Sequence, residues 1–414
     1  MCLVNIKKKL NLRIMIKRLT FLIGIPFVLL CSFLFYTDLH LYMRPTPKSF
    51  DEMLSQYIEA AKLPGASVLA FKEGEIVFSK QYGYANLESQ IAPTQDTLYQ
   101  VASVSKLVTG TAVLKLYEQG KLNLDDDINQ YLPFGVRNPH FPDTSITIRM
   151  LLSHVSSISD GSFFLGSPYW DLYQNIGTEK FKAEKLALFI ASYFTPNSKY
   201  YDEANNFNTS KPGTKPEYSN VAYGLLGYLV ENISGMPFNE FCKQEIFTPL
   251  GMSHTRWLSE NLETSNVAMP YSYDLISRTF QSIGTYEQPT FPDGGLKTSN
   301  IEFMRFLHIF LNDGKTIQGE PFLQPEIVDE MLTIQYPKVN KIAGLTWWVD
   351  DNKYIHGGSD PGVKALVAIS KHEQWGVIFF ANGGGFRTEL GFELFRDDLY
   401  DYLNRHGPPI SKEH

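Results

Sequence analysis

The sequence predicts an α+β protein in which one antiparallel β-sheet is flanked by N- and C-terminal helices, with a mainly helical lobe inserted between its strands. Two strand-like runs near the start, Ala66–Phe71 and Glu75–Lys80, are joined across Glu73-Gly74. Closely spaced β-rich runs return near the end of the chain, as in an antiparallel meander. The longer middle of the chain is helical and rich in loops. We therefore expect a second lobe, with a cleft between the lobes as the site.

Apolar periodicity and helix-end signals locate the helices. Ser49 and Glu52 form a capping-box pattern before an apolar stripe, which predicts a helix over Ser49–Lys62. The run Val104–Gln119 has the same periodicity and ends at Gly120. Further helices are predicted near Glu179–Tyr193, Val221–Ile233, Ile301–Leu311 and Phe386–Asn404, and the C-terminal strands at Gly344–Val349, Lys353–Ile355, Val363–Ser370 and Trp375–Ala381.

An uncharged run, Leu19–Thr37, follows a leader that has six basic and no acidic side chains. At about 1.5 Å per residue this run approaches the thickness of a bilayer core, so it predicts a transmembrane anchor. The basic leader then places the N-terminus in the cytoplasm and the body on the extracytoplasmic side, which is the periplasm in a Gram-negative cell. The alternatives are secretion after cleavage of a signal peptide, and a true start at Met15.

The chain is therefore expected to consist of a leader, an anchor, a linker and one globular domain with two lobes. The sequence leaves the oligomeric state open. The expected bounds are 1–18 for the basic cytoplasmic leader, 19–37 for the anchor, 38–48 for the linker and 49–408 for the domain, with an α/β lobe from about 49–100 and 290–408 and a helical lobe over about 101–289.

Composition narrows the classes of function. The formal net charge is −7, and six of the 37 basic residues fall in 1–18, so the body is more acidic than the whole chain and nucleic acid is a poor candidate partner. Only Cys242 of the three cysteines lies in the body, which therefore has no internal disulfide. None of the nine histidines forms a close H-x-H or H-x-x-x-H pair, which disfavours a metal hydrolase. We expect no metal, no cofactor, and a small-molecule or peptide substrate.

The first chemical motif is Ser103-Val104-Ser105-Lys106, at the start of a predicted helix. A serine at helix position i and a lysine at i+3 share one face, and this S-x-x-K occurs once in the chain. A serine nucleophile needs a base, and lysine is one only with a lowered pKa, which burial and the helix dipole favour. The Ser103 N–H would face a developing oxyanion. Taken alone, the motif also fits an N-cap serine followed by a solvated lysine.

The second motif is Tyr218-Ser219-Asn220, which directly precedes an apolar helix and follows a Pro-Gly turn. A tyrosine acidified by a neighbouring ammonium group can move a proton. The Asn220 amide would bind a substrate carbonyl or orient Lys106. Other Y-x-N triplets in the chain lack this context, so the position before the helix is what favours this one.

The third motif is His356-Gly357-Gly358, at the end of a predicted strand. Its glycines would let a substrate backbone approach the strand edge closely. The N–H of Ser359 is a candidate second oxyanion donor. The alternative is a turn that carries a surface histidine.

In this order, S-x-x-K, then Y-x-N about 115 residues later, then H-G-G another 138 on, the motifs resemble those of serine β-lactamase and penicillin-binding-protein-like hydrolases. The resemblance is to the branch of class C β-lactamases and D-alanyl-D-alanine carboxypeptidases, with related D-amino-acid peptidases and esterases. The segments Leu151–Ser157, Pro212–Thr214 and Gly294–Leu296 also fit, and the similarity spans about residues 50–405.

The resemblance implies a β-lactamase/transpeptidase-like fold and roles for the matched residues. Ser103 would be acylated, Lys106 and Tyr218 would share proton transfer, and the N–H groups of Ser103 and Ser359 would hold the oxyanion. His356 departs from the lysine of class C β-lactamases, although peptidase relatives have histidine there. A histidine of ordinary pKa near 6.5 is mostly neutral at pH 7, which predicts a poor β-lactamase that binds carboxylates better as the pH falls toward 6.

The predicted function is hydrolysis of an amide or ester through an acyl-enzyme. The substrate would be a cell-wall or D-amino-acid peptide or a small ester, and β-lactamase activity is the alternative within the class. An alternative of another class is a catalytically silent binding or assembly protein of the same fold. The aromatic insertion over 160–210 is expected to shape the pocket, so no one relative supplies the substrate.

Overall fold

The computed structural model describes residues 47–173, 185–257, 266–385, 395–399, 401–403 and 405–408. The chain divides into two compact units, 1–61 and 62–414. In the first unit the structure describes one helix, α3 (Phe50–Ala60), whose N-cap Ser49 hydroxyl accepts from the Glu52 N–H at 3.1 Å. The helix predicted from the capping box is therefore confirmed.

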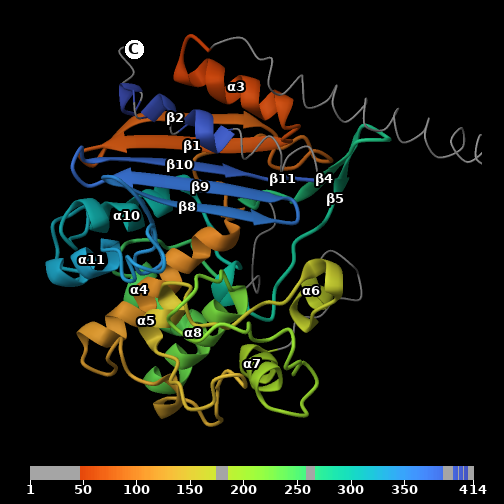
Figure 1. The fold of residues 1–414 in the computed structure, drawn as a ribbon. Coiled ribbons are helices and arrows are strands. Elements are labelled where there is room, and N and C mark those ends of the chain that lie inside the picture. The colour runs from red at the N-terminus through yellow and green to blue at the C-terminus, as the bar shows by residue number, and fades with distance from the viewer. Residues whose placement is uncertain are drawn as a thin grey trace, which may run out of the picture. The chain divides into compact units, whose positions relative to one another are not determined.

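The second unit contains a six-stranded antiparallel sheet in the order β2-β1-β10-β9-β8-β7 (Figure 1). Strands from near the start of the chain pair with strands from near its end, because Ala66 of β1 lies opposite Ala381 of β10. Glu73 and Gly74 both have left-handed backbone conformation, as the predicted tight turn between β1 and β2 requires. The strands are β1 (Gly65–Lys72), β2 (Glu75–Gly83), β7 (Trp348–Asp350), β8 (Lys353–Asp360), β9 (Val363–Ser370) and β10 (Trp375–Ala381).

Helices cover both faces of this sheet. The alternation of side chains along β10 sends Phe380 to one face, where its ring contacts Phe303 of α10 (Asn300–Leu311). The preceding residue, Phe379, points to the opposite face of the sheet. Its ring contacts Phe395, in the helical segment 395–399, at 4.8 Å between ring centroids. Strands β9 and β10 are accordingly buried along their whole length. These features confirm the predicted α+β class with an antiparallel sheet.

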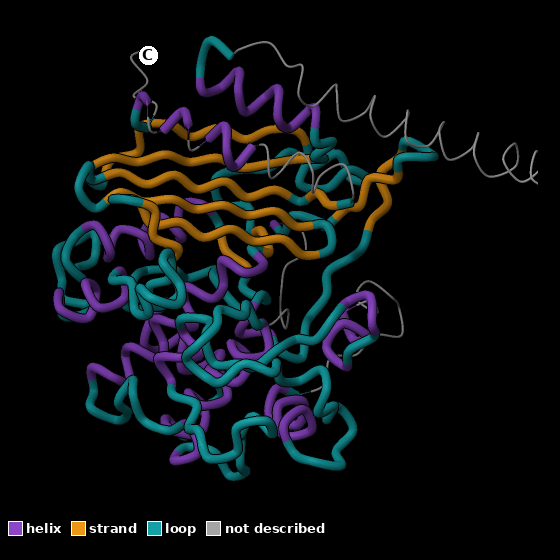
Figure 2. The backbone as a smooth tube through the Cα atoms, viewed as in Figure 1, coloured by secondary structure: helices purple, strands orange, loops and turns teal. Residues whose placement is uncertain are grey.

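Most other helices lie between β2 and β7 in sequence, below the sheet in the view of Figure 2. At their centre α4 packs against α8, and α4 is buried on nearly every side. The elements of this region are η2 (Ala102–Val104), α4 (Ser105–Glu118), η3 (Ile128–Gln130), α5 (Ile148–Leu152), η4 (Phe163–Leu165), α6 (Pro168–Tyr173), α7 (Leu186–Phe194), α8 (Asn220–Ser234), α9 (Phe238–Cys242), the π-helical turn η5 (Lys243–Phe247), η7 (Phe291–Asp293) and α11 (Pro325–Leu332).

Two small sheets complete the described strands. The pair of β3 (Tyr99–Gln100) with β6 (Lys297–Thr298) is antiparallel and lies just before the turn that carries Ser103. The second small sheet has three strands, β11 (Gly383–Gly384), β4 (Tyr271–Asp274) and β5 (Thr279–Ser282).

Some predicted bounds differ from the structure. The run Gly344–Val349 is mostly turn and only β7 is strand, because Thr346 has a left-handed φ of 78° and its N–H bonds to Leu152 rather than to a strand. The strand predicted over Lys353–Ile355 is longer in the structure, where β8 reaches Asp360. Parts of two predicted helices, 179–184 and 386–394, fall outside the described residues.

The prediction of a single-pass membrane protein is contradicted. Among the described residues no helix is both long and apolar enough to cross a bilayer. The longest of them, α8, has 15 residues and spans about 22 Å, which is short of a hydrocarbon core of about 30 Å. The anchor predicted over 19–37 and its flanking leader lie outside the described residues. We therefore withdraw the localisation that rested on them.

Candidate active site

Ser103 lies on the short turn η2, which leads directly into α4. Ala102, just before it, has a left-handed φ of 46°, a conformation that costs a non-glycine residue on the order of 1 kcal/mol. Segment 293–298 anchors this turn, since Val101 N–H donates to the Leu296 carbonyl at 3.0 Å and the Ser105 hydroxyl accepts from the Leu296 N–H at 3.1 Å. The strained and anchored turn leaves Ser103 partly exposed at the start of α4.

Lys106 lies one helical turn after Ser103 and is completely buried. Its ammonium group donates to Ser103 Oγ at 2.9 Å, to Asn220 Oδ1 at 2.7 Å and to the Asp293 carbonyl at 2.9 Å, so all three N–H groups have an acceptor. Burial lowers the pKa of Lys106, but the Tyr218 oxygen and nearby carboxyls outweigh burial, and the net pKa is raised. The lowered lysine pKa expected from the sequence is therefore wrong, because burial does not act alone here.

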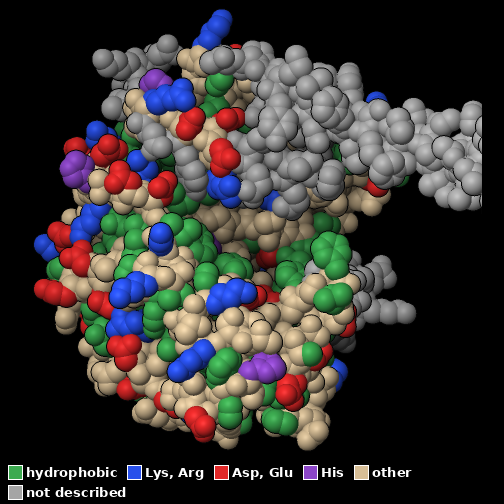
Figure 3. All heavy atoms as spheres, in the orientation of Figure 1, with side chains coloured by type: hydrophobic (Ala, Val, Ile, Leu, Met, Phe, Trp, Pro, Cys, Tyr) green, Lys and Arg blue, Asp and Glu red, His purple; other side chains and the backbone are tan. Residues whose placement is uncertain are grey.

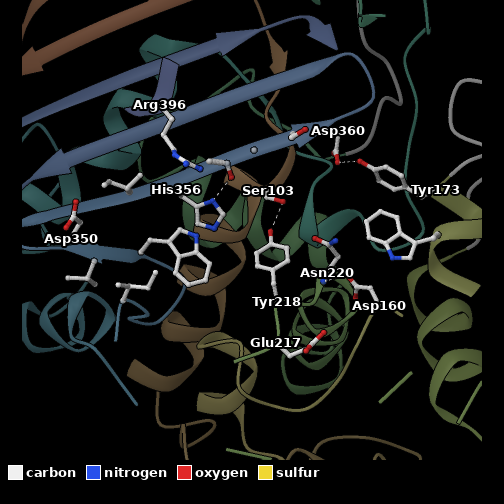
Figure 4. Close-up of a pocket in the computed structure, with 18 of the residues that line it drawn as sticks. Ser103, Asp160, Tyr173, Glu217, Tyr218, Asn220, Asp350, His356, Asp360 and Arg396 are labelled. Atoms are coloured by element: carbon white, nitrogen blue, oxygen red, sulfur yellow. Dashed lines mark hydrogen bonds between the residues drawn. The ribbon is translucent and has the colours of Figure 1, made fainter. Parts of the chain in front are cut away.

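Tyr218 donates its phenolic O–H to Ser103 Oγ at 2.8 Å (Figure 4). The Lys106 nitrogen lies 5.0 Å from the centre of the Tyr218 ring, close enough to stabilise negative charge on the phenol. On the other side, the His154 ring stacks on Tyr218 at 4.4 Å between centroids. Ser103 Oγ is thus held by a phenol and an ammonium group at once.

His154 is a buried histidine that the sequence did not single out as a site residue. Its Nδ1 accepts the Ser219 N–H at 3.3 Å, which fixes the tautomer with the proton on Nε2. Burial, together with the charge on Lys106, lowers the pKa of His154 well below its ordinary value. Its ring is therefore neutral, and it also stacks on Trp348 at 5.7 Å.

The start of α8 places Tyr218 and Asn220. Ser219 is the N-cap of this helix, and its hydroxyl donates to Asp160 Oδ1 at 2.9 Å. The same carboxylate accepts the N–H groups of Asn220 and Val221 at 2.8 and 3.0 Å, as an anion at a helix N-terminus does. Asp160 therefore fixes the first residues of α8, Ser219 to Val221, and no motif in the sequence pointed to it.

The third motif lies on β8, beside the Ser103 turn. A Cβ on Gly358 would come within 2.5 Å of the Val101 carbonyl and 3.1 Å of the Ser103 nitrogen, so only glycine allows this approach. Gly357 and Ser359 line the same cleft, and Lys364 of β9 donates to the Ser359 hydroxyl. The strand edge and the helix start therefore face one space, where the two predicted oxyanion donors lie.

His356 is also buried, yet its ring lines the cleft. Its Nδ1 lies 2.8 Å from the Gly357 carbonyl, which can only accept, so Nδ1 carries the proton. Burial, and then the charge on Lys106, lowers the pKa of His356 to about 3. The ordinary pKa assumed from the sequence is therefore wrong, and the stronger carboxylate binding expected toward pH 6 loses the protonated ring on which it was argued.

Two further buried acids border the site. Burial raises the pKa of Asp293 to about 8, so this carboxyl is mostly protonated at pH 7. Burial also raises the pKa of Asp360 to about 6, although bonds from Tyr173 and from Gln288 Nε2, the latter at 3.0 Å, act against it. Among the described residues, no group of three or more His, Cys, Asp or Glu side chains is arranged to hold a metal.

The cleft between β8 and the start of α8 has a volume of about 770 Å³ and opens at the hollow seen near the centre of Figure 3. It contains all but one of the predicted site residues at its surface, while Lys106 lies behind Ser103. Asp360, Tyr173 and Asp160 lie on one side of Ser103 in Figure 4, and Asp350 and Arg396 lie on the other. The lining residues are Ser103, Asp160, Gly161, Trp170, Tyr173, Glu217, Tyr218, Asn220, Ile342, Trp348, Val349, Asp350, Ile355, His356, Gly357, Gly358, Ser359, Asp360 and Arg396.

This fold, with a serine at a helix start bonded to a lysine one turn on and to a tyrosine from another helix, defines a class of serine-dependent α+β hydrolases. The sequence model of the β-lactamase family matches residues 50–397. The chain belongs to that family, which is a family of serine hydrolases.

Individual relatives are distant. Penicillin-binding protein 4* of Bacillus subtilis strain 168 is 30% identical over 76% of this chain and 67% of its own length. Protein flp of Staphylococcus aureus strain MRSA252 is 24% identical over 81% of this chain and 62% of its own, so this chain spans less than two thirds of that relative. The octameric penicillin-binding protein homologue from Pyrococcus abyssi shares the fold, with a TM-score of 0.69 at 24% identity, over 84% of this chain and 76% of its own.

Proposed function

We propose that this protein hydrolyses an amide or ester through an acyl-enzyme on Ser103, with Tyr218 as the proton-transfer group. The single observation that carries the proposal is the pair of bonds to Ser103 Oγ, from Tyr218 at 2.8 Å and from Lys106 at 2.9 Å. Because the pKa of Lys106 is raised, its ammonium group keeps its proton, so we assign the transfer of the Ser103 proton to Tyr218.

In the proposed reaction, the solvent-exposed Tyr218 first gives its phenolic proton to water; Ser103 Oγ then bonds to the substrate carbonyl carbon while its own proton passes to the Tyr218 oxygen. The oxyanion that forms accepts from the N–H groups of Ser103 and Ser359. Tyr218 then returns the proton to the leaving nitrogen or oxygen as the carbonyl bond to it breaks. Water repeats the sequence in reverse, with its proton passing through Tyr218 and back to Ser103 as the acid leaves.

An active-site probe tests this proposal directly. A fluorophosphonate should add its mass to the peptide that contains Ser103, and Ser103→Ala should abolish both the label and the hydrolysis of simple esters. Equal labelling of the two proteins would contradict the assignment. An unlabelled but folded wild-type protein would favour the alternative of a silent binding protein.

A further inference from the structure

Asp293 is a buried acid that the proposed reaction does not use. It ends the short turn η7, and only 2% of the residue is exposed. Its main-chain carbonyl accepts from the Lys106 ammonium group at 2.9 Å, so the residue is in direct contact with the cation behind Ser103. The side chain is a separate feature, because any residue at this position could supply the carbonyl.

The surroundings of the Asp293 carboxyl leave it without a hydrogen bond to that cation. All three N–H groups of Lys106 bond elsewhere, to Ser103 Oγ, to Asn220 Oδ1 and to the Asp293 carbonyl. Asp293 Oδ2 is buried and has no hydrogen-bond partner among the described residues. A buried carboxyl oxygen that lacks a donor is far less costly when the group is neutral than when it is charged. The geometry therefore favours a protonated Asp293, in agreement with the pKa of about 8 to which burial raises this carboxyl.

The turn that carries Asp293 is packed closely between the two central helices. The Thr109 hydroxyl of α4 donates to the Pro292 carbonyl at 2.6 Å. On α8, a Cβ on Gly227 would come within 2.4 Å of the Pro292 side chain, so this close contact requires a glycine. The turn therefore has little freedom to move away from Lys106.

Two more buried acids lie near the same cation. Asp160 accepts the Asn220 N–H at 2.8 Å, and the Asn220 side chain in turn accepts from Lys106. Asp360 approaches the end of the turn, since its Oδ2 lies 3.1 Å from the position of a Cβ on Gly294. Figure 4 shows both acids on the same side of the nucleophile. The cation thus already has two acids beside it before the third one ionises.

The charge on Asp293 therefore acts within a group of side chains that contains one cation. Lys106 lies 5.0 Å from the centre of the Tyr218 ring and stabilises negative charge there. An ionised Asp293 would oppose that effect, because a nearby like charge disfavours the ionised form of a neighbouring group. The titratable groups that act on Asp293, or that share its neighbours, are Lys106 of α4, Tyr169 of α6, Asp360 of β8, Asp160 and Tyr218.

We propose that Asp293 is a positioning residue for acyl transfer, whose carboxyl acts on Ser103 through Lys106 and Tyr218: it permits the transfer of the Ser103 proton while it is neutral and opposes that transfer once it is charged. This inference rests on the proposed function. Acyl transfer at Ser103 that is insensitive to the charge on Asp293 would leave that function standing.

The test is a pH profile of the full chain on a neutral ester, corrected for spontaneous hydrolysis, between pH 6.5 and pH 9.5. Asp293→Asn has nearly the shape of the protonated acid and cannot ionise. The ratio of kcat/KM at pH 9.5 to kcat/KM at pH 6.5 should be at least about tenfold higher in this variant than in the wild type, the usual size of the effect of a like charge on a neighbouring group. Asp293→Leu, which has no charge and makes no hydrogen bond, should raise the ratio to the same extent.

Asp313→Asn is the matched control, because it removes an exposed carboxylate that pairs with Lys371 at 3.0 Å and does not line the cleft, and it should keep the wild-type ratio. Equal ratios in the wild type and the two neutral variants of Asp293 would overturn the proposal. An increase in the Asp313 variant, or in only one of two folded neutral variants, would overturn it as well. Comparing ratios within each protein removes differences in the amount of folded enzyme.

Ser103→Ala, measured in parallel, tests the proposed function separately. Hydrolysis that persists in this variant would overturn the role of Ser103. Hydrolysis that is lost in it, together with equal pH ratios in the wild type and the Asp293 variants, would overturn the role of Asp293 alone.

Discussion

Two buried basic side chains flank Ser103, and their surroundings leave one of them charged and the other neutral. Lys106, on the helical side, has three hydrogen-bond acceptors and lies near the acidic groups of Tyr218, Asp293 and Asp360, so it keeps its proton despite complete burial. His356, on the strand side, has one carbonyl partner and faces the Lys106 charge, so it loses its proton. Burial is common to both. The comparison teaches that the partners of a buried group, more than its depth, decide its charge in this site.

Removing either side chain that bonds to Ser103 Oγ should have the largest effect on turnover. Lys106→Ala and Tyr218→Phe should each lower kcat by at least about 10²-fold, since both act on the proton of Ser103. Because they act as one unit, the double variant should lose much less than the product of the two single losses. Steady-state kinetics on a simple ester would measure this. A fully multiplicative loss would show that Lys106 and Tyr218 act independently, and the contrast with His356 would then need another explanation.

His154 offers a second comparison, because it is neutral like His356 but contacts Tyr218 directly. His154→Phe keeps a ring to stack on Tyr218, while His154→Asn keeps an acceptor for the Ser219 N–H and suits the left-handed φ of 55°. If stacking positions Tyr218, the Asn variant should lose about tenfold in kcat with little change in KM, and the Phe variant much less.

The reverse order would mean that the bond to Ser219, rather than the stack, holds the tyrosine. If both variants have a lower kcat, a higher KM and a lower melting temperature to a similar extent, His154 acts only as a packed core residue. The conclusion depends on comparing kcat and KM of the two variants, so a folding defect in one variant alone would not produce either pattern.

The sequence was a good guide where local pattern decides structure. The strands Val363–Ser370 and Trp375–Ala381 match β9 and β10 residue for residue, and the S-x-x-K spacing put Ser103 and Lys106 in contact. It failed where distant segments meet. Asp160 is 59 residues from Ser219, so no local pattern shows that it fixes the start of α8.

The charge of Lys106 could not be predicted for the same reason. Its pKa depends on Tyr218, Asp293 and Asp360, each more than 100 residues away in sequence. The motifs predicted that Ser103, Lys106 and Tyr218 would lie close together. The combined effect of the acidic groups around Lys106 raises its pKa, whereas burial alone would lower it. His154 was visible within the Leu151–Ser157 segment, but its contact with Tyr218 was not.

The smallest effect is expected from the titration of His356, and it falls on stability rather than on turnover. The folded pKa of about 3 lies below the ordinary value near 6.5, so between these values the unfolded chain binds the extra proton. The free energy of unfolding contributed by this group is therefore complete above pH 6.5 and is lost as the pH falls toward 3. His356→Asn removes the titration while keeping a donor for the Gly357 carbonyl.

Between pH 7 and pH 5 the wild type should consequently lose about 1–2 kcal/mol more stability than His356→Asn, measured by urea unfolding at each pH. Its kcat/KM on a neutral ester should show no inflection from His356 over the same range, because the folded ring is neutral throughout. An identical loss of stability in the two proteins would mean that His356 keeps an ordinary pKa in the fold. In that case the neutral ring assigned to His356 in the cleft would lose its basis.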